Sequence, residues 1–211
     1  MAAQDVKTPH GPARVHLHAV DAPRAALVLG HGAGGGVSAP DLISATEAAL
    51  ELELAVALVE QPYRVAGRRS PAPAHQLDAA WTAVVAALRA GQLAGLAVVT
   101  GGRSSGARVA CRTAEATGAV GVLCLAFPLR PPRRSGDAPS RLPELEAVPA
   151  PVLVVQGARD PFGVPPGGRG ARSSRCRPTT VSAPTSARSR RPSATGSDER
   201  SSSACRPSPR R

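Results

Sequence analysis

The sequence has few aromatic residues and no long apolar run. Aromatic side chains make up 2% of its 211 residues, against 42% that are hydrophobic, so a core has to be built from alanine, valine and leucine. Such a core suits helices packed on a parallel sheet of valine- and leucine-rich strands. No apolar run approaches the roughly 20 residues needed to cross a bilayer, and the N-terminus lacks the apolar segment of a signal peptide. We therefore expect one cytoplasmic domain without a membrane partner.

Cysteine is also scarce, and the spacing of the cysteines does not match the patterns of metal sites or disulfide frameworks. The four cysteines form no C-x-x-C or metal-ligand pattern, so the sequence predicts neither a metal site nor a disulfide framework. No dinucleotide-binding or P-loop pattern is present. We expect no cofactor.

Acidic residues are depleted only near the C-terminus. The formal net charge is +11, and residues 161–211 contain 11 of the 26 Lys and Arg residues but only two of the 15 Asp and Glu residues. We therefore divide the chain into a domain over residues 1–165 and a basic, low-complexity tail over residues 166–211. Arginines of the tail could bind the phosphates of nucleic acid. Such binding would be nonspecific, because the tail has no aromatic residue for base stacking.

Short apolar runs alternate with amphipathic segments through the domain. This order predicts an α/β fold with a mostly parallel sheet and helices on both faces, in which ligands collect at the carboxyl ends of the strands. The expected strands are 13–20, 24–30, 54–59, 95–100, 120–127 and 150–156, and the expected helices begin at residue 40 and cover 75–90, 105–117 and 140–148, with a surface loop over 64–74.

A glycine-framed serine follows the fourth expected strand. The segment from Gly102 to Gly106 fits the G-x-S-x-G pattern, in which a tight strand-to-helix turn presents a serine hydroxyl above a sheet. Ser104 is then the candidate nucleophile, and the glycines avoid a clash in the turn. Ser105 would supply a backbone N–H to an oxyanion. The alternative is an ordinary glycine-rich loop between a strand and a helix.

Two other strand ends carry candidate residues. The glycine loop after residue 30 offers the N–H of Gly32 or Ala33 as the second oxyanion donor; as an alternative it could bind phosphate, although it lacks the known phosphate-loop patterns. Asp160, after the last expected strand, could orient a catalytic histidine, or it could cap an Asp-Pro turn. Arg103 and Arg108 could bind an acidic substrate group, but solvated arginines are the more common case.

Five motifs occur in order between residues 13 and 165. They are Gly30-His31-Gly32-Ala33-Gly34; Gln61-Pro62-Tyr63 with Gly67-Arg68-Arg69; Gly101-Gly102-Arg103-Ser104; Phe127-Pro128-Leu129-Arg130-Pro131-Pro132; and Gln156-Gly157 with Arg159-Asp160-Pro161-Phe162-Gly163.

Together these motifs resemble the α/β-hydrolase-like family. The resemblance is to the branch of bacterial dienelactone-hydrolase-like proteins, testis-expressed proteins and a subunit of the nonspecific-lethal histone acetyltransferase complex. It implies a serine-hydrolase fold but no particular substrate, since some members act as complex subunits. The family pattern also implies a histidine in a turn after one further strand, followed by a closing helix.

That histidine is missing. None of the five histidines follows Asp160, and residues 163–211 contain no Leu, Ile, Met, Phe, Tyr or Trp. We expect this segment to be disordered, so that the fold lacks its last strand and helix and the strand at 151–155 is a bare edge. Codons for Pro178 to Ser186 can be chosen that, read two bases later, encode Asp-His-Ser-Leu-Ser-Ala-Asp-Leu. A frameshift between about residues 163 and 177 would therefore explain the tail.

These observations predict a serine hydrolase that acts on a small ester, thioester or lactone. Ser104 would attack, Asp160 would orient a histidine, and the loop after Gly30 would hold the oxyanion with Ser105. Because the histidine is missing, we expect little or no turnover from the chain as it stands. The alternatives are a noncatalytic interaction module with a hydrolase fold and a nucleic-acid binder that uses the basic tail.

Overall fold

The structure, a computed structural model, describes residues 2–130, 139–166 and 171–176. All of them belong to one compact unit, Met1–Pro178. The strands are β1 (Ala2–Thr8), β2 (Gly11–His18), β3 (Ala25–Gly30), β4 (Leu54–Glu60), β5 (Val98–Arg103), β6 (Gly121–Leu125), β7 (Val152–Gly157) and β8 (Ala171–Cys176). The helices are α1 (Pro40–Glu51), α2 (Pro62–Val65), α3 (Ala74–Ala90), α4 (Ser105–Thr117) and α5 (Leu142–Glu146).

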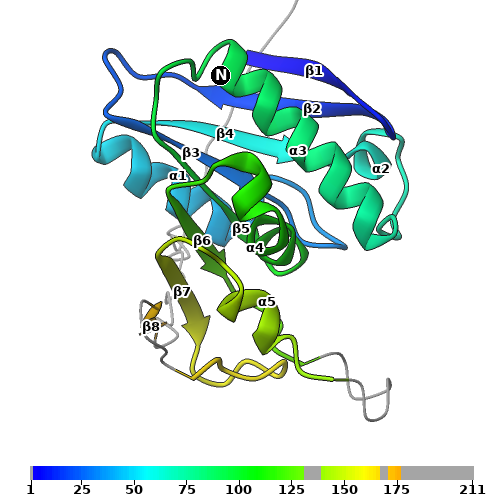
Figure 1. Cartoon of the computed structure of the whole chain (residues 1–211), viewed down its shortest axis with the longest axis vertical. Coiled ribbons are helices and arrows are strands. Elements are labelled where there is room, and N and C mark those ends of the chain that lie inside the picture. Colours follow the sequence, from blue (N-terminus) through cyan, green and yellow to red (C-terminus); the bar gives the residue numbers. More distant parts are fainter. Residues whose placement is uncertain (1, 131–138, 167–170, 177–211) are drawn as a thin grey trace, which may run out of the picture. The chain divides into compact units, whose positions relative to one another are not determined.

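The strands form one sheet in the order β1-β2-β4-β3-β5-β6-β7-β8 (Figure 1). All neighbours from β4 to β8 pair in parallel, whereas β1 and β2 add an antiparallel hairpin at one edge. The order reverses beside β3, as in doubly wound folds whose ligands bind at the carboxyl ends of the strands. The predicted α/β class with a mostly parallel sheet is confirmed.

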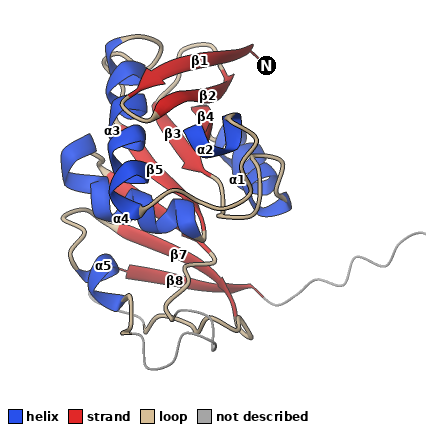
Figure 2. Cartoon of the chain, turned by 90° about the vertical axis from the view of Figure 1, so that its right-hand side faces the viewer, coloured by secondary structure: helices blue, strands red, loops and turns tan. Residues whose placement is uncertain are grey.

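Helices cover both faces of the sheet. Figure 2 shows α3, α4 and α5 on one side and α1 on the other. The core on the α3 side is built around Trp81, which is fully buried among alanine, valine and leucine side chains of β2, β3, β4 and α3. As the composition predicts, aliphatic residues fill most of the core. No helix in the part of the chain that the structure describes is long and apolar enough to cross a membrane.

Three elements were not expected from the sequence. β1 and the short α2 lie in segments where we predicted no regular structure, and β8 corrects the prediction of a bare edge after residue 150. β8 pairs in parallel with β7 from Val152↔Ala171 to Gly157↔Cys176. A ladder of this kind uses only backbone N–H and C=O groups, so the lack of apolar side chains does not prevent it. Of the residues expected to be disordered, 167–170 and 177–211 lie outside the described part.

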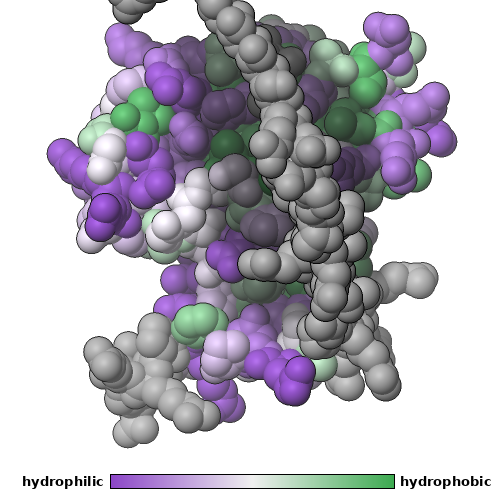
Figure 3. Space-filling view, turned by 180° about the vertical axis from the view of Figure 1, so that it is seen from behind, coloured by the Kyte–Doolittle hydropathy of each residue, from purple (hydrophilic) through white to green (hydrophobic). Residues whose placement is uncertain are grey.

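One face of β7 stays open beside this added strand. Val152 and Val154 are buried on the α5 side, whereas Leu153 points to the α1 side and is 41% exposed. Figure 2 draws no helix beside β7 on that side. On the face seen from behind in Figure 3, hydrophobic residues are scattered among hydrophilic ones where the surface is coloured. Within the described residues, no helix follows β7 to complete the second layer. The segment in which we expect the closing helix to be missing continues through residues 177–211, outside the described part.

Removing the Trp81 side chain tests the described core. Trp81→Ala should lower the free energy of unfolding by about 3 to 5 kcal/mol, because a fully buried indole leaves a large cavity. The matched control is Leu52→Ala, since Leu52 is 62% exposed and should change stability by about 0.5 kcal/mol or less. Urea unfolding followed by circular dichroism measures both. Equal effects of the two substitutions would contradict the described packing.

Candidate active site

Ser104 occupies the single residue between β5 and α4. Its backbone has φ 51° and ψ −104°, a conformation that non-glycine residues rarely adopt. The Ser104 N–H donates a hydrogen bond to the Leu125 carbonyl at the end of β6, at 2.9 Å. The neighbouring strand thus fixes the strained turn, and Ser104 itself is half-buried at the carboxyl edge of the sheet. Strain of this kind is found at functional sites more often than elsewhere.

Both glycines that frame the serine are required by a close approach of two backbones. A Cβ atom built on Gly106 would overlap with the Gly30 carbonyl and lie 2.9 Å from the His31 oxygen. A Cβ on Gly102 would overlap with the same carbonyl and lie 2.9 Å from the Gly30 nitrogen. The G-x-S-x-G pattern therefore lets β5 and α4 approach the end of β3, where the glycine loop begins.

That approach brings the glycine loop alongside the serine. A Cβ atom built on Gly32 would lie 3.7 Å from the Ser104 Cβ and 3.0 Å from the Arg103 guanidinium. Ser105 is the first residue of α4, so its N–H has no carbonyl partner within the helix. The structure therefore brings Gly32, Ser104 and the positive end of the α4 dipole together.

Two side chains hold the carbonyl groups of the loop. Tyr63 donates its hydroxyl hydrogen bond to the Ala33 carbonyl at 2.8 Å. The His31 Nδ1 lies 2.8 Å from the Gly32 carbonyl, while the His31 Nε2 accepts the Gln61 N–H at 3.1 Å. Within the described residues, no hydrogen bond uses the N–H of Gly32 or Ala33. Among the described residues, these two N–H groups thus have no protein acceptor.

The hydrogen bonds of His31 also fix its protonation. Because Nε2 accepts a hydrogen bond, the ring proton lies on Nδ1, which donates to the Gly32 carbonyl. Burial lowers the pKa of His31, and this favours the same neutral form. Both ring nitrogens are occupied by backbone groups, so His31 cannot serve as a base for Ser104. Sequence reasoning did not identify His31, Gln61 and Tyr63 as anchors of the loop; the Gln-Pro-Tyr run after β4 was the available signal.

Asp160 lies in a tight turn three residues after β7. Its Oδ1 accepts the Phe162 N–H at 2.8 Å, and its carbonyl accepts the Gly163 N–H at 3.0 Å. The fully buried Gln156 donates its amide hydrogens to the Phe127 and Gly163 carbonyls, both at 3.0 Å. The turn is thereby held to the exit of β6. Asp160 thus makes the turn-capping contact that we considered as its alternative role.

Strand register places Asp160 and Ser104 on one edge of the sheet. Arg103 pairs with Leu125 of β6, and Leu125 pairs with Val155 of β7. β5 and β7 are separated by β6 alone, which is roughly 10 Å at ordinary strand spacing. The other four histidines lie on the β1–β2 hairpin, on β2 and at the start of α3. No histidine of the described residues lies between Ser104 and Asp160 on the strands that link them.

The two arginines near the serine are both paired with carboxylates. Arg103 donates from Nε to Asp41 at 2.8 Å, which links β5 to the first turn of α1. Arg108 makes a bidentate pair with Glu144 of α5, at 2.9 and 2.5 Å. Arg108 is therefore a link between α4 and α5. Both arginines are thus paired, although the Arg103 side chain remains 43% exposed, close to the solvated case that we considered.

The sheet, the serine turn and the glycine loop have the arrangement of the α/β-hydrolase fold. The family model described as an alpha/beta hydrolase domain matches residues 23–169 of the chain. This chain belongs to that family. No curated protein sequence is significantly similar to it.

Solved structures with the same fold include several hydrolases. Est1E from Butyrivibrio proteoclasticus with ferulic acid bound is 14% identical, with a TM-score of 0.67 over 82% of this chain and 88% of that chain. An alpha-beta serine hydrolase homologue from Coxiella burnetii is 15% identical, with a TM-score of 0.61 over 74% and 73%. A dienelactone hydrolase from Anabaena variabilis is 18% identical, with a TM-score of 0.58 over 75% and 74%. At these identities the likeness shows the fold alone.

Substituting Gly106 tests the close backbone approach. Gly106→Ala should destabilise the protein by about 1 to 3 kcal/mol, because the added methyl overlaps with the Gly30 carbonyl. In an unobstructed helix the same change would stabilise the protein by up to about 1 kcal/mol. A destabilised variant therefore supports the close backbone approach, and a stabilised variant contradicts it. Gly36→Ala is the control, since nothing lies within 4 Å of its added Cβ. A stabilised Gly106→Ala protein, measured by urea unfolding, would refute this geometry.

Tyr63 can be titrated alone because it is the only tyrosine. Burial raises its pKa above 10.0, with Arg64 opposing the shift. The buried phenol therefore contributes stability that is fully present below about pH 10 and is lost as the pH rises through the raised pKa. Absorbance at phenolate wavelengths should change at higher pH in native protein than in urea, and Tyr63→Phe should abolish the change. Coincident native and unfolded titrations would show that the Tyr63 phenol is not buried.

Proposed function

We propose that the site at Ser104 is that of a serine hydrolase for small carboxylic esters, thioesters or lactones, and that it lacks its catalytic base in this chain. The observation that supports this most strongly is the strained Ser104 turn beside the free N–H groups of the glycine loop. Acyl transfer needs a presented nucleophile and preplaced donors for the oxyanion. The fold neighbours named as Est1E with ferulic acid and as a dienelactone hydrolase agree with a substrate of this class.

The roles follow from positions at the carboxyl edge. Ser104 would attack the carbonyl carbon, and the N–H groups of Ser105 and of Gly32 or Ala33 would hold the negative oxygen. β5 and β7 lie roughly 10 Å apart, one on each side of β6, so one imidazole ring would fit between Ser104 and Asp160 at the carboxyl edge. Asp160 would orient that ring. A serine hydroxyl without a base remains a poor nucleophile. We therefore propose little or no turnover for the chain as it stands.

The gene can be edited to test the frameshift and the missing base together. A chain whose reading frame is shifted by two bases between residues 163 and 177 should gain a histidine and react with a fluorophosphonate probe, which labels activated serines. The chain as it stands should react at least about 100-fold more slowly, because general-base assistance contributes about that factor or more. Labelling is measured by intact-protein mass spectrometry.

Two substitutions in the shifted chain locate the reaction. Ser104→Ala should abolish labelling, whereas Ser105→Ala should retain it, because Ser105 is proposed to act only through its backbone N–H. If a folded, shifted chain is not labelled, the proposed nucleophile is wrong and the noncatalytic module is supported. Rapid labelling of the unshifted chain would instead contradict the claim that the base is missing.

A further inference from the structure

β1 pairs with a strand on one of its edges only. It is the first strand in the sheet order and pairs with β2, so within the described residues its outer edge has no strand partner (Figure 1). β1 contains no proline, and its register with β2 runs without a bulge from Ala2↔Leu17 to Thr8↔Gly11. Prolines and bulges are common means of blocking such an edge. The charges on β1 therefore decide what this edge can pair with.

The pairing of β1 with β2 shows which backbone groups face the outer edge. Residues of an antiparallel pair alternate between those that exchange hydrogen bonds and those that do not. Lys7 lies opposite Pro12, which has no N–H, so these two residues cannot exchange hydrogen bonds. By alternation, Asp5 and Arg14 do not exchange them either. The backbone N–H and C=O groups of Asp5 and Lys7 therefore point away from β2, to the outer edge.

Charge selects one register for a second copy of β1. If two copies pair antiparallel through these outward groups, Asp5 opposite Asp5, or Lys7 opposite Lys7, would bring like charges together, which is unfavourable. Asp5 opposite Lys7 of the second copy brings opposite charges together. A two-fold axis repeats each contact, so this pair forms on both sides of the axis. In this register the charges of β1 are self-complementary.

The side chains of β1 suit the same register. The Asp5 carboxylate accepts Nε and Nη2 of Arg14 at 2.8 and 3.3 Å and is still 49% exposed. A carboxylate has about four acceptor sites, so a further donor can bind it. Lys7 is exposed and makes no ion pair within the described residues. Val6 would lie on the two-fold axis; it is half-buried against the core on the α3 side, so contact with Val6 of the second copy would bury more apolar surface.

We propose that the outer edge of β1 binds a second copy of this chain. Asp5 and Lys7 of the two copies lie opposite each other and exchange main-chain hydrogen bonds, so that one sheet runs through both copies. β2, β4 and β3 lie between β1 and β5, so this interface is separate from Ser104 and does not depend on the proposed reaction.

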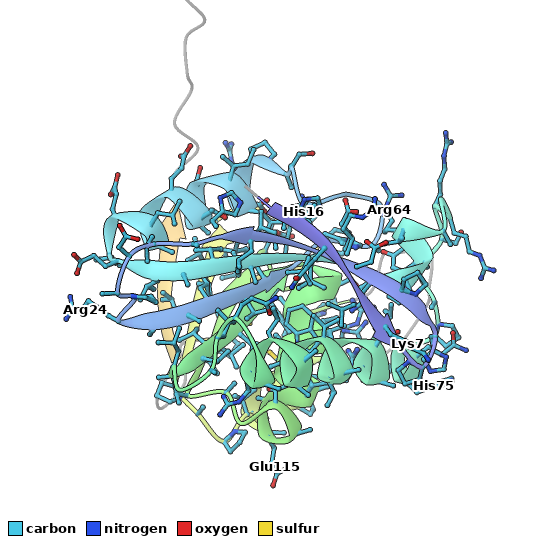
Figure 4. The ribbon with its side chains drawn as sticks, turned by 90° about the horizontal axis from the view of Figure 1, so that it is seen from above. Lys7, His16, Arg24, Arg64, His75 and Glu115 are labelled. Carbon is cyan, nitrogen blue, oxygen red and sulfur yellow. The ribbon has the colours of Figure 1, made fainter. Side chains whose placement is uncertain are left out.

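Sedimentation equilibrium of the full chain measures the association. An interface of one strand edge is small, so we expect a monomer–dimer equilibrium with a dissociation constant of about 10 μM to 1 mM. Lys7→Glu should raise this constant at least about tenfold, because both attractive pairs become repulsive. Arg24→Glu is the matched control, with the same change in charge. Arg24 is exposed and lies at the opposite end of the molecule from Lys7 (Figure 4), so its substitution should leave the constant unchanged.

Mixing two variants tests the register itself. Asp5→Lys should also weaken dimerisation, because it places two lysines opposite each other. In a mixed dimer of an Asp5→Lys chain and a Lys7→Glu chain, each pair again joins opposite charges, so mixing should recover most of the lost affinity. Both side chains are exposed, and loss of the exposed Asp5–Arg14 pair costs little stability, so both variants should fold.

Crosslinking of the unaltered chain locates the contact. Lys7 is the only lysine of the sequence, so a carbodiimide, which condenses a carboxylate and an amine to an amide, has one side-chain amine to use. In a mixture of isotope-labelled and unlabelled chains, mass spectrometry should find Lys7 of one copy joined to Asp5 of the other.

Three results would overturn the proposal. A chain that stays monomeric up to about 1 mM would mean that the edge serves a different partner or none. Equal effects of Lys7→Glu and Arg24→Glu would mean that any dimer uses another surface. A mixture of the two charge variants that dimerises no better than either variant alone would contradict the register.

Discussion

The structure depends on one close contact between backbones, where the start of α4 and the end of β5 meet Gly30. Only residues without a Cβ fit at Gly102 and Gly106, and the contact forces the intervening Ser104 into a positive φ. The same contact sets the glycine loop beside the serine and directs the first N–H groups of α4 toward the carboxyl edge of the sheet. The backbone contact at Gly30 is thus both a packing constraint and the feature that arranges the candidate catalytic residues.

Buried glutamines play matching roles on the two flanks of this feature. Gln61 follows β4 and holds His31 and the α3 backbone, while Gln156 ends β7 and holds the turn of Asp160 to the exit of β6. Each amide has an Oε1 without a partner among the described residues. An amide ties irregular segments together without burying a charge, although each unpartnered Oε1 still carries a desolvation cost. Both loops are therefore held before any ligand arrives.

The sequence predicted the class of fold and the positions of the main elements, but less of the contacts. The helix Ser105–Thr117 has the predicted bounds, since Gly118 ends it in a left-handed conformation. β5 begins three residues later than predicted, because Gly95 belongs to a turn with φ 77°. β1 and β8 were missed because pairing with a neighbouring strand stabilises them and no apolar alternation marks them. The pairing of Arg108 with Glu144 joins residues 36 positions apart, and local patterns do not record such partners. The roles of Ser104 and Asp160 remain predictions.

We propose that the site has its nucleophile and oxyanion donors but no base. Free imidazole can act as a general base from solution, so the most direct measurement is the rate at which a fluorophosphonate modifies the unaltered chain with and without imidazole. We expect slow modification at Ser104 that imidazole accelerates in proportion to its concentration, and no modification of that position in Ser104→Ala. Modification that is already rapid without imidazole, or no modification of Ser104 at any imidazole concentration, would contradict it.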